Sequence, residues 1–377
     1  DSVASRGLGD VYKRQDYDSA VTLDSSNDYW VGVLGSQLKA IDSSLVNFVP
    51  TYARPSAFTD ETLTLAGGTL GSTDNDNVQA ALAKLEPVNV NFVVPLFSQD
   101  ASVDISDGET DASSAYTISG ITTRVLTHVT NMSKIKIKKN RQAFLSHKGT
   151  YSATKALVNG SAFLSTPYQF RGSLAFQPIK MFNTVSGTAE VFQPWMVSAI
   201  AAAAQSAAGY RPIFNKGLNV LGVEEVSGYD GGVPAQEDAL QSGLLVLADS
   251  SNGVDTVFLS DQTTYLFPDN NFVYNSIQAV YGADVIALTL QQQTETFVGQ
   301  STADVSAPVA ASFIQSVLAN LLNQKWIAPS SDAPAGYKNL KVSINAPVMN
   351  VSVECKESTG IYFVPINLSI SGVQSAV

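Results

Sequence analysis

The chain has 377 residues, of which 45% are apolar and only 15% are charged. This balance is the reverse of that in disordered chains, so it predicts packed cores, and the length suffices for two or three domains. The net charge of −11 argues against a protein that binds nucleic acid, because the phosphates would repel it.

Other classes of protein are also disfavoured by the composition. No apolar run approaches the about 20 residues of a membrane span, so membrane insertion is not expected. The single cysteine, Cys355, allows neither an intrachain disulfide nor a cysteine metal cluster. We expect it to be a small buried residue on a strand.

The first 15 residues differ in character from the rest of the chain. Residues 5–15 resemble the translation of a common transposase-based sequencing adapter, and no Met begins the chain. We therefore expect residues 1–15 to be an artefact, which we exclude from the fold argument. Residues 16–62 are expected to be a truncated N-terminal segment.

Strand and helix patterns alternate between residues 63 and 300. After a glycine-rich turn, apolar residues recur at helical spacing from Val78 to Leu85, with Asp74 as a capping residue and Pro87 as the stop. Further helices are predicted at residues 118–132, 151–164, 193–208, 236–243 and 272–292, and extended segments at residues 29–34, 88–94, 173–176, 217–226, 244–248 and 254–259. The alternation predicts an α/β (α+β) fold in which helices flank a mixed sheet.

Features that would indicate catalysis are weak. The glycine turn at residues 67–71 lacks a following Lys-Ser/Thr pair and fits no nucleotide fingerprint, which favours an ordinary turn. The acidic residues 99–115 lack the calcium-loop register, which favours a solvated surface loop. His128 and His147 form no zinc-type pair, and we expect surface or helix histidines. No catalytic residue, cofactor or metal is therefore predicted.

One basic patch stands out in this acidic chain. Its members are Lys134, Lys136, Lys138, Lys139 and Arg141. The lysines alternate with isoleucines, a pattern that predicts a strand with one basic face and one buried face. A solvated edge, where lysine discourages stray pairing, is favoured over a contact with an acidic partner.

The last part of the chain combines a long amphipathic helix with β-rich runs. The helix is predicted at residues 305–326, with Val309, Ile314 and Leu318 among the apolar stripe, and the β-rich runs at residues 340–355 and 361–370. Pro365 cannot donate a ladder hydrogen bond, which suits an edge or exchanged strand. The alternative is a strand that completes the sheet of its own chain.

Several of these segments, taken in order, resemble the contractile tail sheath proteins of phages and related injection machines. Residues 65–95 are similar to the family's "Leu-Ala-Gly-Gly, turn, helix, Leu-Glu, strand" segment. An alanine-rich helix, a Gly-x-x-Pro turn and an apolar strand follow at residues 199–223. Thr263 and Thr264 follow a strand within residues 255–275, and residues 297–329 resemble the "Val-Gly, spacer, long helix, Ile" element. The likeness spans residues 63–377.

The resemblance implies a structural subunit that polymerises around a tail tube and contracts, without consuming nucleotide, to drive the tube through the host envelope. It implies a core domain at residues 63–300 and a C-terminal sheath domain at residues 301–377. The implied partners are further copies of the chain, the tail tube protein, and the baseplate and tail terminator proteins. The implied location is the virion tail, after assembly in the host cytoplasm.

The resemblance also implies roles for residues near the C-terminus. Gln315, Gln324 and Lys325 are expected to face the tail tube. A terminal arm is expected to join subunits by strand exchange, through Ile361, Tyr362, Phe363, Val364, Ile366, Leu368 and Ile370. Two other classes stay open on the sequence alone. One is another virion component, such as a baseplate, tube or capsid-decorating protein, and the other is an α/β enzyme that uses the glycine turn.

Overall fold

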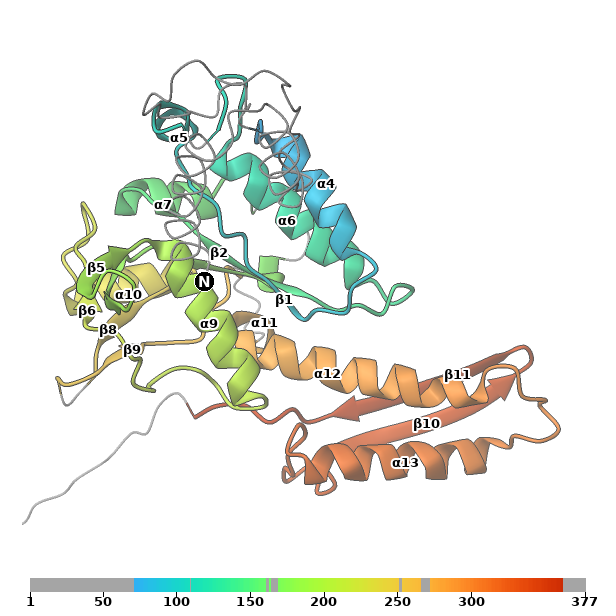
Figure 1. The fold of residues 1–377 in the computed structure, drawn as a ribbon. Helices are drawn as coiled ribbons and strands as arrows, with labels where there is room; N and C mark the ends of the chain where they lie inside the picture. The colour runs from blue at the N-terminus through green and yellow to red at the C-terminus, as the bar shows by residue number, and fades with distance from the viewer. Residues whose placement is uncertain are drawn as a thin grey trace, which may run out of the picture. The chain divides into compact units, whose positions relative to one another are not determined.

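A four-stranded parallel sheet lies at the centre of the computed structural model (Figure 1). The structure describes residues 71–108, 110–160, 163, 169–250, 253–265 and 272–361. The strands are ordered β1 (Phe92–Val93), β2 (Gln142–Ser146), β3 (Gly172–Ala175) and β7 (Leu244–Leu245), and every neighbouring pair is parallel. Both faces of β2 and β3 are buried, as is usual for a parallel sheet covered by helices on both sides.

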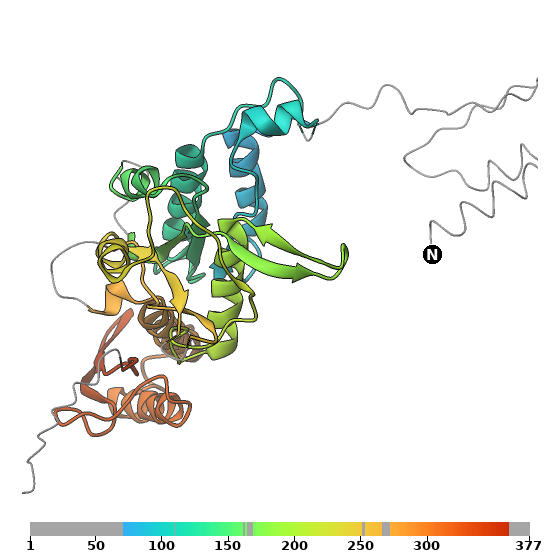
Figure 2. The ribbon, with the colours of Figure 1, turned by 90° about the vertical axis from the view of Figure 1, so that its left-hand side faces the viewer.

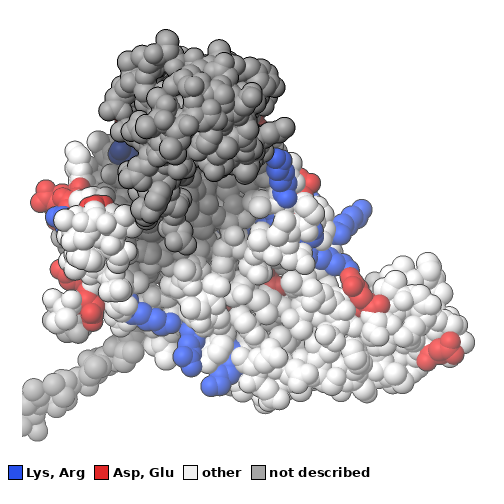
Figure 3. Space-filling view, in the orientation of Figure 1, with Lys and Arg blue, Asp and Glu red and all other residues white. Residues whose placement is uncertain are grey.

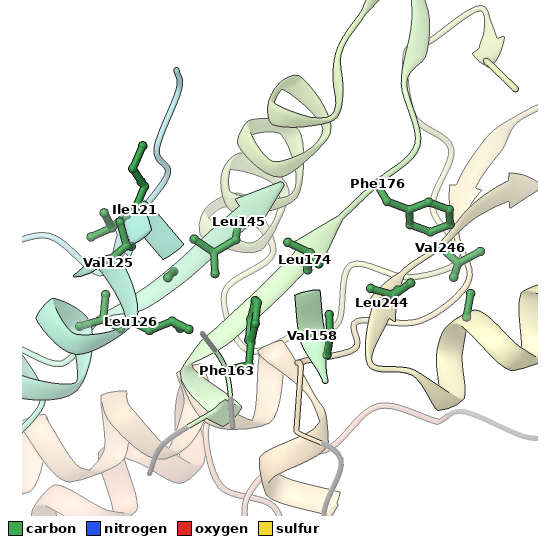
Figure 4. Packing of buried hydrophobic residues seen from close by; sticks show 14 of the residues in the cluster. Ile121, Val125, Leu126, Leu145, Val158, Phe163, Leu174, Phe176, Leu244 and Val246 are labelled. Atoms are coloured by element: carbon green, nitrogen blue, oxygen red, sulfur yellow. The ribbon is translucent and has the colours of Figure 1, made fainter. Parts of the chain in front are cut away.

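Helices cover both faces of this sheet, because successive strand residues point to opposite sides. On one side Leu145 and Leu174 pack with α4, α6, α7 and α10 (Figure 4). On the other side Phe144 and Ala175 pack with α9 and the start of α12. These helices are α4 (Asn75–Leu85), α6 (Ile118–Met132), α7 (Tyr151–Val158), α9 (Pro194–Ala208), α10 (Val233–Gln241) and α12 (Ile277–Thr294).

Local sequence signals explain where several of these helices begin and end. Asp74 accepts a hydrogen bond from the backbone N–H of Asn77 at the start of α4, and Thr117 accepts one from Gly120 at the start of α6. These side chains satisfy donors that have no partner within the helix. Gly209 follows α9 with a φ of 60°, a conformation that glycine adopts without steric cost.

Antiparallel pairs extend the structure beyond the parallel sheet. Strand β4 (Ile179–Asn183) pairs with both β5 (Thr188–Phe192) and β6 (Gly222–Val223), and β8 (Leu247–Asp249) pairs with β9 (Thr256–Phe258). The β4–β5 hairpin extends away from the helical layers (Figure 2). Parallel and antiparallel pairing together confirm the α/β (α+β) class predicted from the sequence.

The C-terminal part is a helix packed on a β-hairpin. Helix α13 (Ala307–Asn323) begins at Ser306, whose side chain caps it, and the hairpin consists of β10 (Tyr337–Asn345) and β11 (Val348–Cys355). Ile314, Leu318 and Leu321 of α13 pack with one face of the hairpin and with Ile286 of α12. The predicted succession of amphipathic helix and β-rich segment is therefore confirmed. The domain boundaries at residues 62/63 and 300/301 stay predictions.

Some predicted elements differ from the structure. Residues 99–115 contain a short helix, α5 (Ala101–Ser106), because Asp100 caps it with its side chain. The predicted helix at residues 272–292 is interrupted at Ser276, whose hydroxyl caps α12 and separates it from α11 (Phe272–Asn275). Val285 is only half-buried and its neighbour Asp284 is buried instead. The predicted strand at residues 29–34 and the glycines before Gly71 lie outside the described residues.

Candidate assembly surfaces

Strands β10 and β11 form a two-stranded antiparallel sheet. Side chains alternate along β10. Leu340, Val342 and Ile344 are half-buried, and the residues between them are exposed. Leu340 and Val342 pack in the same cluster as α13. Among the described residues no third strand joins this sheet. Backbone donors and acceptors on an outer strand can pair with another chain, so the hairpin offers a place for strand addition.

The chain leaves this hairpin through a segment that is tied to the rest of the protein. The backbone N–H of Ser358 donates to the carbonyl of Trp326, and the side-chain Nε2 of Gln278 donates to the Ser358 carbonyl at 2.6 Å. Ile361 is 78% exposed and is the last described residue. The expected strand residues Tyr362 to Ile370 lie outside the described residues, so the terminal arm stays a prediction.

A buried carboxyl lies at the base of this segment. Glu357 pairs with Ile327 in an antiparallel bridge, and its Oε1 faces α12 so closely that a Cβ at Gly282 would lie 2.1 Å from it. Within the described part of the chain, Oε1 has no hydrogen-bond partner. Burial, and then the nearby charge of Asp284, raise the pKa of Glu357 to about 9. The carboxyl is therefore neutral at pH 7.

Replacing Glu357 by Gln is expected to stabilise the protein at pH 8. Because the pKa is about 9 in the folded state and 4.5 when unfolded, folding takes up a proton and stability falls as pH rises between these values. Glutamine carries no such penalty. With a discount for partial exposure, we expect a gain of about 1–2 kcal/mol in the free energy of unfolding at pH 8. At pH 5 the gain should nearly vanish.

Urea unfolding at pH 5 and pH 8 measures this effect. Glu237→Gln, which changes an exposed carboxyl on α10, is the matched control and should leave stability unchanged at both values. An equal effect of Glu357→Gln at both pH values would show that the carboxyl is not held neutral by the fold.

The residues expected to face a tail tube lie on or just after α13. Gln315, Gln324 and Lys325 are all exposed. Gln315 lies on the exposed face of the helix, whereas Gln324 is the C-cap and Lys325 follows with a φ of 65°. A separation of nine residues corresponds to about two and a half helical turns, so Gln315 and Gln324 project from different sides of the helix axis.

The basic patch is a turn, and the predicted strand at residues 134–141 is wrong. Residues 134–137 form turns after α6, and Ile135 is 78% exposed. The backbone N–H groups of Ile137 and Lys138 both donate to the carbonyl of Lys134. These local bonds close a turn, so the alternation of lysine and isoleucine does not reflect two faces of a sheet.

Arg141 does not belong to the surface patch, because its side chain is fully buried. Its guanidinium donates to the carbonyls of Leu85 and Val88 at 2.8 and 2.6 Å, and its Nη1 lies 2.6 Å from Nε2 of His128. Burial, and then the charge of Arg141, lower the pKa of His128. The arginine thus joins the end of α4 to α6 from within.

Of the expected surface or helix positions, the helix position is confirmed for His128, whereas His147 lies neither on the surface nor in a helix. His128 lies within α6 and is buried, and His147 is buried directly after β2. Nδ1 of His147 lies 2.7 Å from the hydroxyl of Thr154, and burial lowers the pKa of the ring. Each ring therefore has a structural partner.

A groove that sequence reasoning missed lies beyond the carboxyl ends of β3 and β7. It has a volume of about 530 Å³, and its lining includes Leu221, Glu225, Asp230 and Asp249. No Lys or Arg is among the described residues that line it. The lining comes from segments far apart in sequence, so the sequence indicated the groove only through the acidic character of residues 224–230.

Within the described residues there is no cluster of three His, Cys, Asp or Glu side chains arranged to hold a metal ion. In the same part of the chain, no helix combines the length and apolar character needed to cross a membrane. Cys355 lies at the end of β11 as predicted, but it is half-buried, and burial raises the pKa of its thiol.

Solved structures share this fold. No protein-family model and no curated protein sequence matches the chain. The crystal structure of a sheath tail protein from Desulfitobacterium hafniense is 12% identical with a TM-score of 0.50, over 76% of this chain and 61% of that protein. A sheath tail protein from Listeria innocua is 14% identical with a TM-score of 0.50, over 82% of this chain and 64% of that protein.

These likenesses establish the fold. They confirm, at the level of architecture, the resemblance that the ordered sequence segments indicated. The chain spans less than two thirds of the length of each of these two sheath tail proteins.

Proposed function

We propose that this protein is a structural subunit of a contractile tail sheath. The observation that carries the proposal is the fold shared with the two sheath tail proteins at a TM-score of 0.50. In this role copies of the chain polymerise around a tail tube protein and end on baseplate and tail terminator proteins, in the tail of a virion or related particle. The energy for contraction is the difference between two packings, summed over many copies.

The proposed polymer is linked by the C-terminal arm. The residues expected in its strand are Ile361, Tyr362, Phe363, Val364, Ile366, Leu368 and Ile370. Among the described residues no third strand joins β10 or β11. The hairpin of a neighbouring copy is therefore a suitable receiver, because strand addition supplies backbone hydrogen bonds with little demand on sequence. Such a link survives rearrangement when the connecting segment bends and the paired strand stays in place.

Negative-stain microscopy of the protein expressed without residues 1–15 tests the proposal. A sheath subunit should form long striated tubes, alone or with its tube protein. A monomer that forms no tubes under any condition, and that a small-molecule ligand stabilises against heat, would instead favour an enzyme.

Exposed residues of α13 supply a test of tube binding. We expect Gln315→Glu and Gln324→Glu, made singly, to leave the monomer folded, because both side chains are exposed. A new carboxylate within an interface should weaken co-sedimentation with the cognate tube protein at least about tenfold. Because the two residues project from different sides of α13, the single variants show which side faces the tube.

Gln241→Glu, at the exposed end of α10, makes the same chemical change elsewhere and should not affect tube binding. If neither variant of α13 weakens co-sedimentation, the assignment of this helix to the tube-facing side is wrong.

A further inference from the structure

The turn between α6 and β2 presents an apolar side chain among lysines, and we call residues 134–139 the lysine loop. Lys134, Ile135 and Lys136 are exposed at its tip. Its base is held in place, because Lys138 forms an ion pair with Glu295 and Nζ of Lys139 donates to the carbonyl of Glu86 at 2.7 Å. A held loop loses little conformational freedom on binding. Ile135, which is 78% exposed, is largely uncovered by the described residues of its own chain.

The groove described above, which we call the acidic groove, has the complementary chemistry. Its apolar wall includes Leu221, which is 63% exposed, and Val223. Glu225, Asp230 and Asp249 are exposed carboxylates at the same groove. Glu224 also lines it but is already paired with Lys180 at 2.7 Å. The groove thus combines an apolar wall with carboxylates that lack a cationic partner among the described residues.

The topology places the lysine loop and the acidic groove at opposite ends of the strands of the parallel sheet. The lysine loop directly precedes β2, so it lies at the amino end of the strands. The acidic groove is lined by Gln177, just after β3, and by Leu247, just after β7. Because β2, β3 and β7 are parallel, the groove lies at the carboxyl end, the usual position of binding crevices in such sheets.

The ribbon and the space-filling view, which share one orientation, agree with this placement (Figures 1 and 3). Figure 3 shows Lys and Arg side chains on the right-hand side, where the loop between α6 and β2 lies in Figure 1. Asp and Glu side chains gather along the left-hand edge, where β5, β6 and α10 lie. The loop of one chain therefore cannot reach the groove of the same chain.

We propose that the lysine loop of one copy docks into the acidic groove of a second copy, with Ile135 against Leu221 and the loop lysines beside Glu225, Asp230 and Asp249. The contact joins different surfaces on the two copies, so repetition generates a ring or a helical filament. The inference deepens the proposed sheath function by naming a contact between subunits other than the C-terminal arm.

Site-directed disulfide formation tests the contact directly. Ile135→Cys on one copy and Leu221→Cys on another are mixed at high concentration under mild oxidation, in full-length protein that carries Cys355→Ser. Mass spectrometry of the digested product should find a peptide pair linked between positions 135 and 221. The link can arise only between copies, because within one chain positions 135 and 221 lie at opposite ends of the parallel strands.

Charge reversal tests the electrostatic part. Lys136→Glu and Glu225→Lys, each alone, are expected to raise the protein concentration needed for tube formation at least about tenfold, since like charges then meet at the interface. The two reversals combined in one chain should restore assembly. Lys148→Glu and Asp304→Lys reverse exposed charges outside the loop and groove and serve as controls, and circular dichroism verifies that each variant is folded.

The disulfide and the tubes together separate the two proposals. Tubes with a 135–221 disulfide support both, and tubes without this disulfide overturn the docking contact while the sheath function stands. A 135–221 disulfide in a protein that forms no tubes supports the contact and contradicts the sheath function. Absence of both results overturns both proposals.

Discussion

Deletion of residues 361–377 is expected to give a soluble, folded monomer that forms no tubes. The described apolar clusters draw their side chains from residues up to Cys355, so the core should survive the loss of the arm. Assembly should not, because each copy loses the strand that we propose it lends to a neighbour. We expect the concentration needed for assembly to rise more than about 100-fold, the effect of losing several interface hydrogen bonds and apolar contacts.

A shorter deletion is the matched control. Removing residues 371–377 takes away only the polar end of the chain and should leave assembly intact. Far-UV circular dichroism, size-exclusion chromatography and negative-stain microscopy report the fold, the oligomeric state and the tubes. Normal tubes after the longer deletion would contradict the arm. Aggregation of the whole protein would show instead that residues 361–370 belong to the core of their own chain.

The parts of the fold that the sequence predicted well are those set by local signals. Helix α6 begins and ends where the apolar period and the Thr117 cap place it. Helix α13 lies within the predicted helix at residues 305–326, and the predicted β-rich run at residues 340–355 lies within the hairpin β10–β11. In each case the deciding interactions lie within a few residues, or follow a regular apolar period that one buried face imposes.

Features set by distant residues could not be predicted. Arg141 lies at the end of a basic run in the sequence, yet its Nη2 donates to the carbonyls of Leu85 and Val88, more than 50 positions earlier. Val309 belongs to the apolar stripe of its helix by spacing but is 59% exposed, whereas its neighbour Ala310 is buried. The lining of the acidic groove combines residues from the segment 221–231 with residues near positions 177, 236 and 248, which are separated in the sequence.

The residues proposed for assembly divide in the same way. Gln315, Gln324 and Lys325 are all exposed, as expected of polar residues, but only Gln315 lies within α13. The lysine loop is recognisable in the sequence as a basic run, but its turn conformation could not be predicted. Whether two lysines and an isoleucine form a strand or a turn depends on which backbone groups are near, and here the carbonyl of Lys134 closes the turn.

Replacing Arg171 by Met is expected to destabilise the protein by about 3–5 kcal/mol, the cost of leaving one member of a buried ion pair unpaired. Arg171 directly precedes β3, and its Nη1 and Nη2 donate to the two carboxylate oxygens of Asp284 in α12 at 2.7 and 2.9 Å. The two side chains are only 11% and 10% exposed. The pair therefore ties the sheet to the long helix that leads to the C-terminal segment.

The destabilisation caused by Arg171→Met should depend on pH, and the environment of Asp284 determines whether it grows or shrinks as pH rises. Burial raises the pKa of Asp284 and the hydrogen bonds and charge of Arg171 lower it, so without Arg171 the pKa rises further. When the pKa of a group is higher in the folded than in the unfolded state, the free energy of unfolding of the protein falls as pH rises between the two values. Urea unfolding should therefore show a larger defect of Arg171→Met at pH 8 than at pH 5. Adding Asp284→Leu should recover most of it, since an apolar pair replaces the isolated charge.

Arg124→Met is the control for this experiment. It breaks an ion pair with Asp76 whose partners are 30% and 89% exposed, and such surface pairs contribute less than about 1 kcal/mol. If Arg171→Met costs no more than Arg124→Met, or if its cost is the same at pH 5 and pH 8, then the ion pair between β3 and α12 does not hold the helix to the sheet in the way that its burial and geometry indicate.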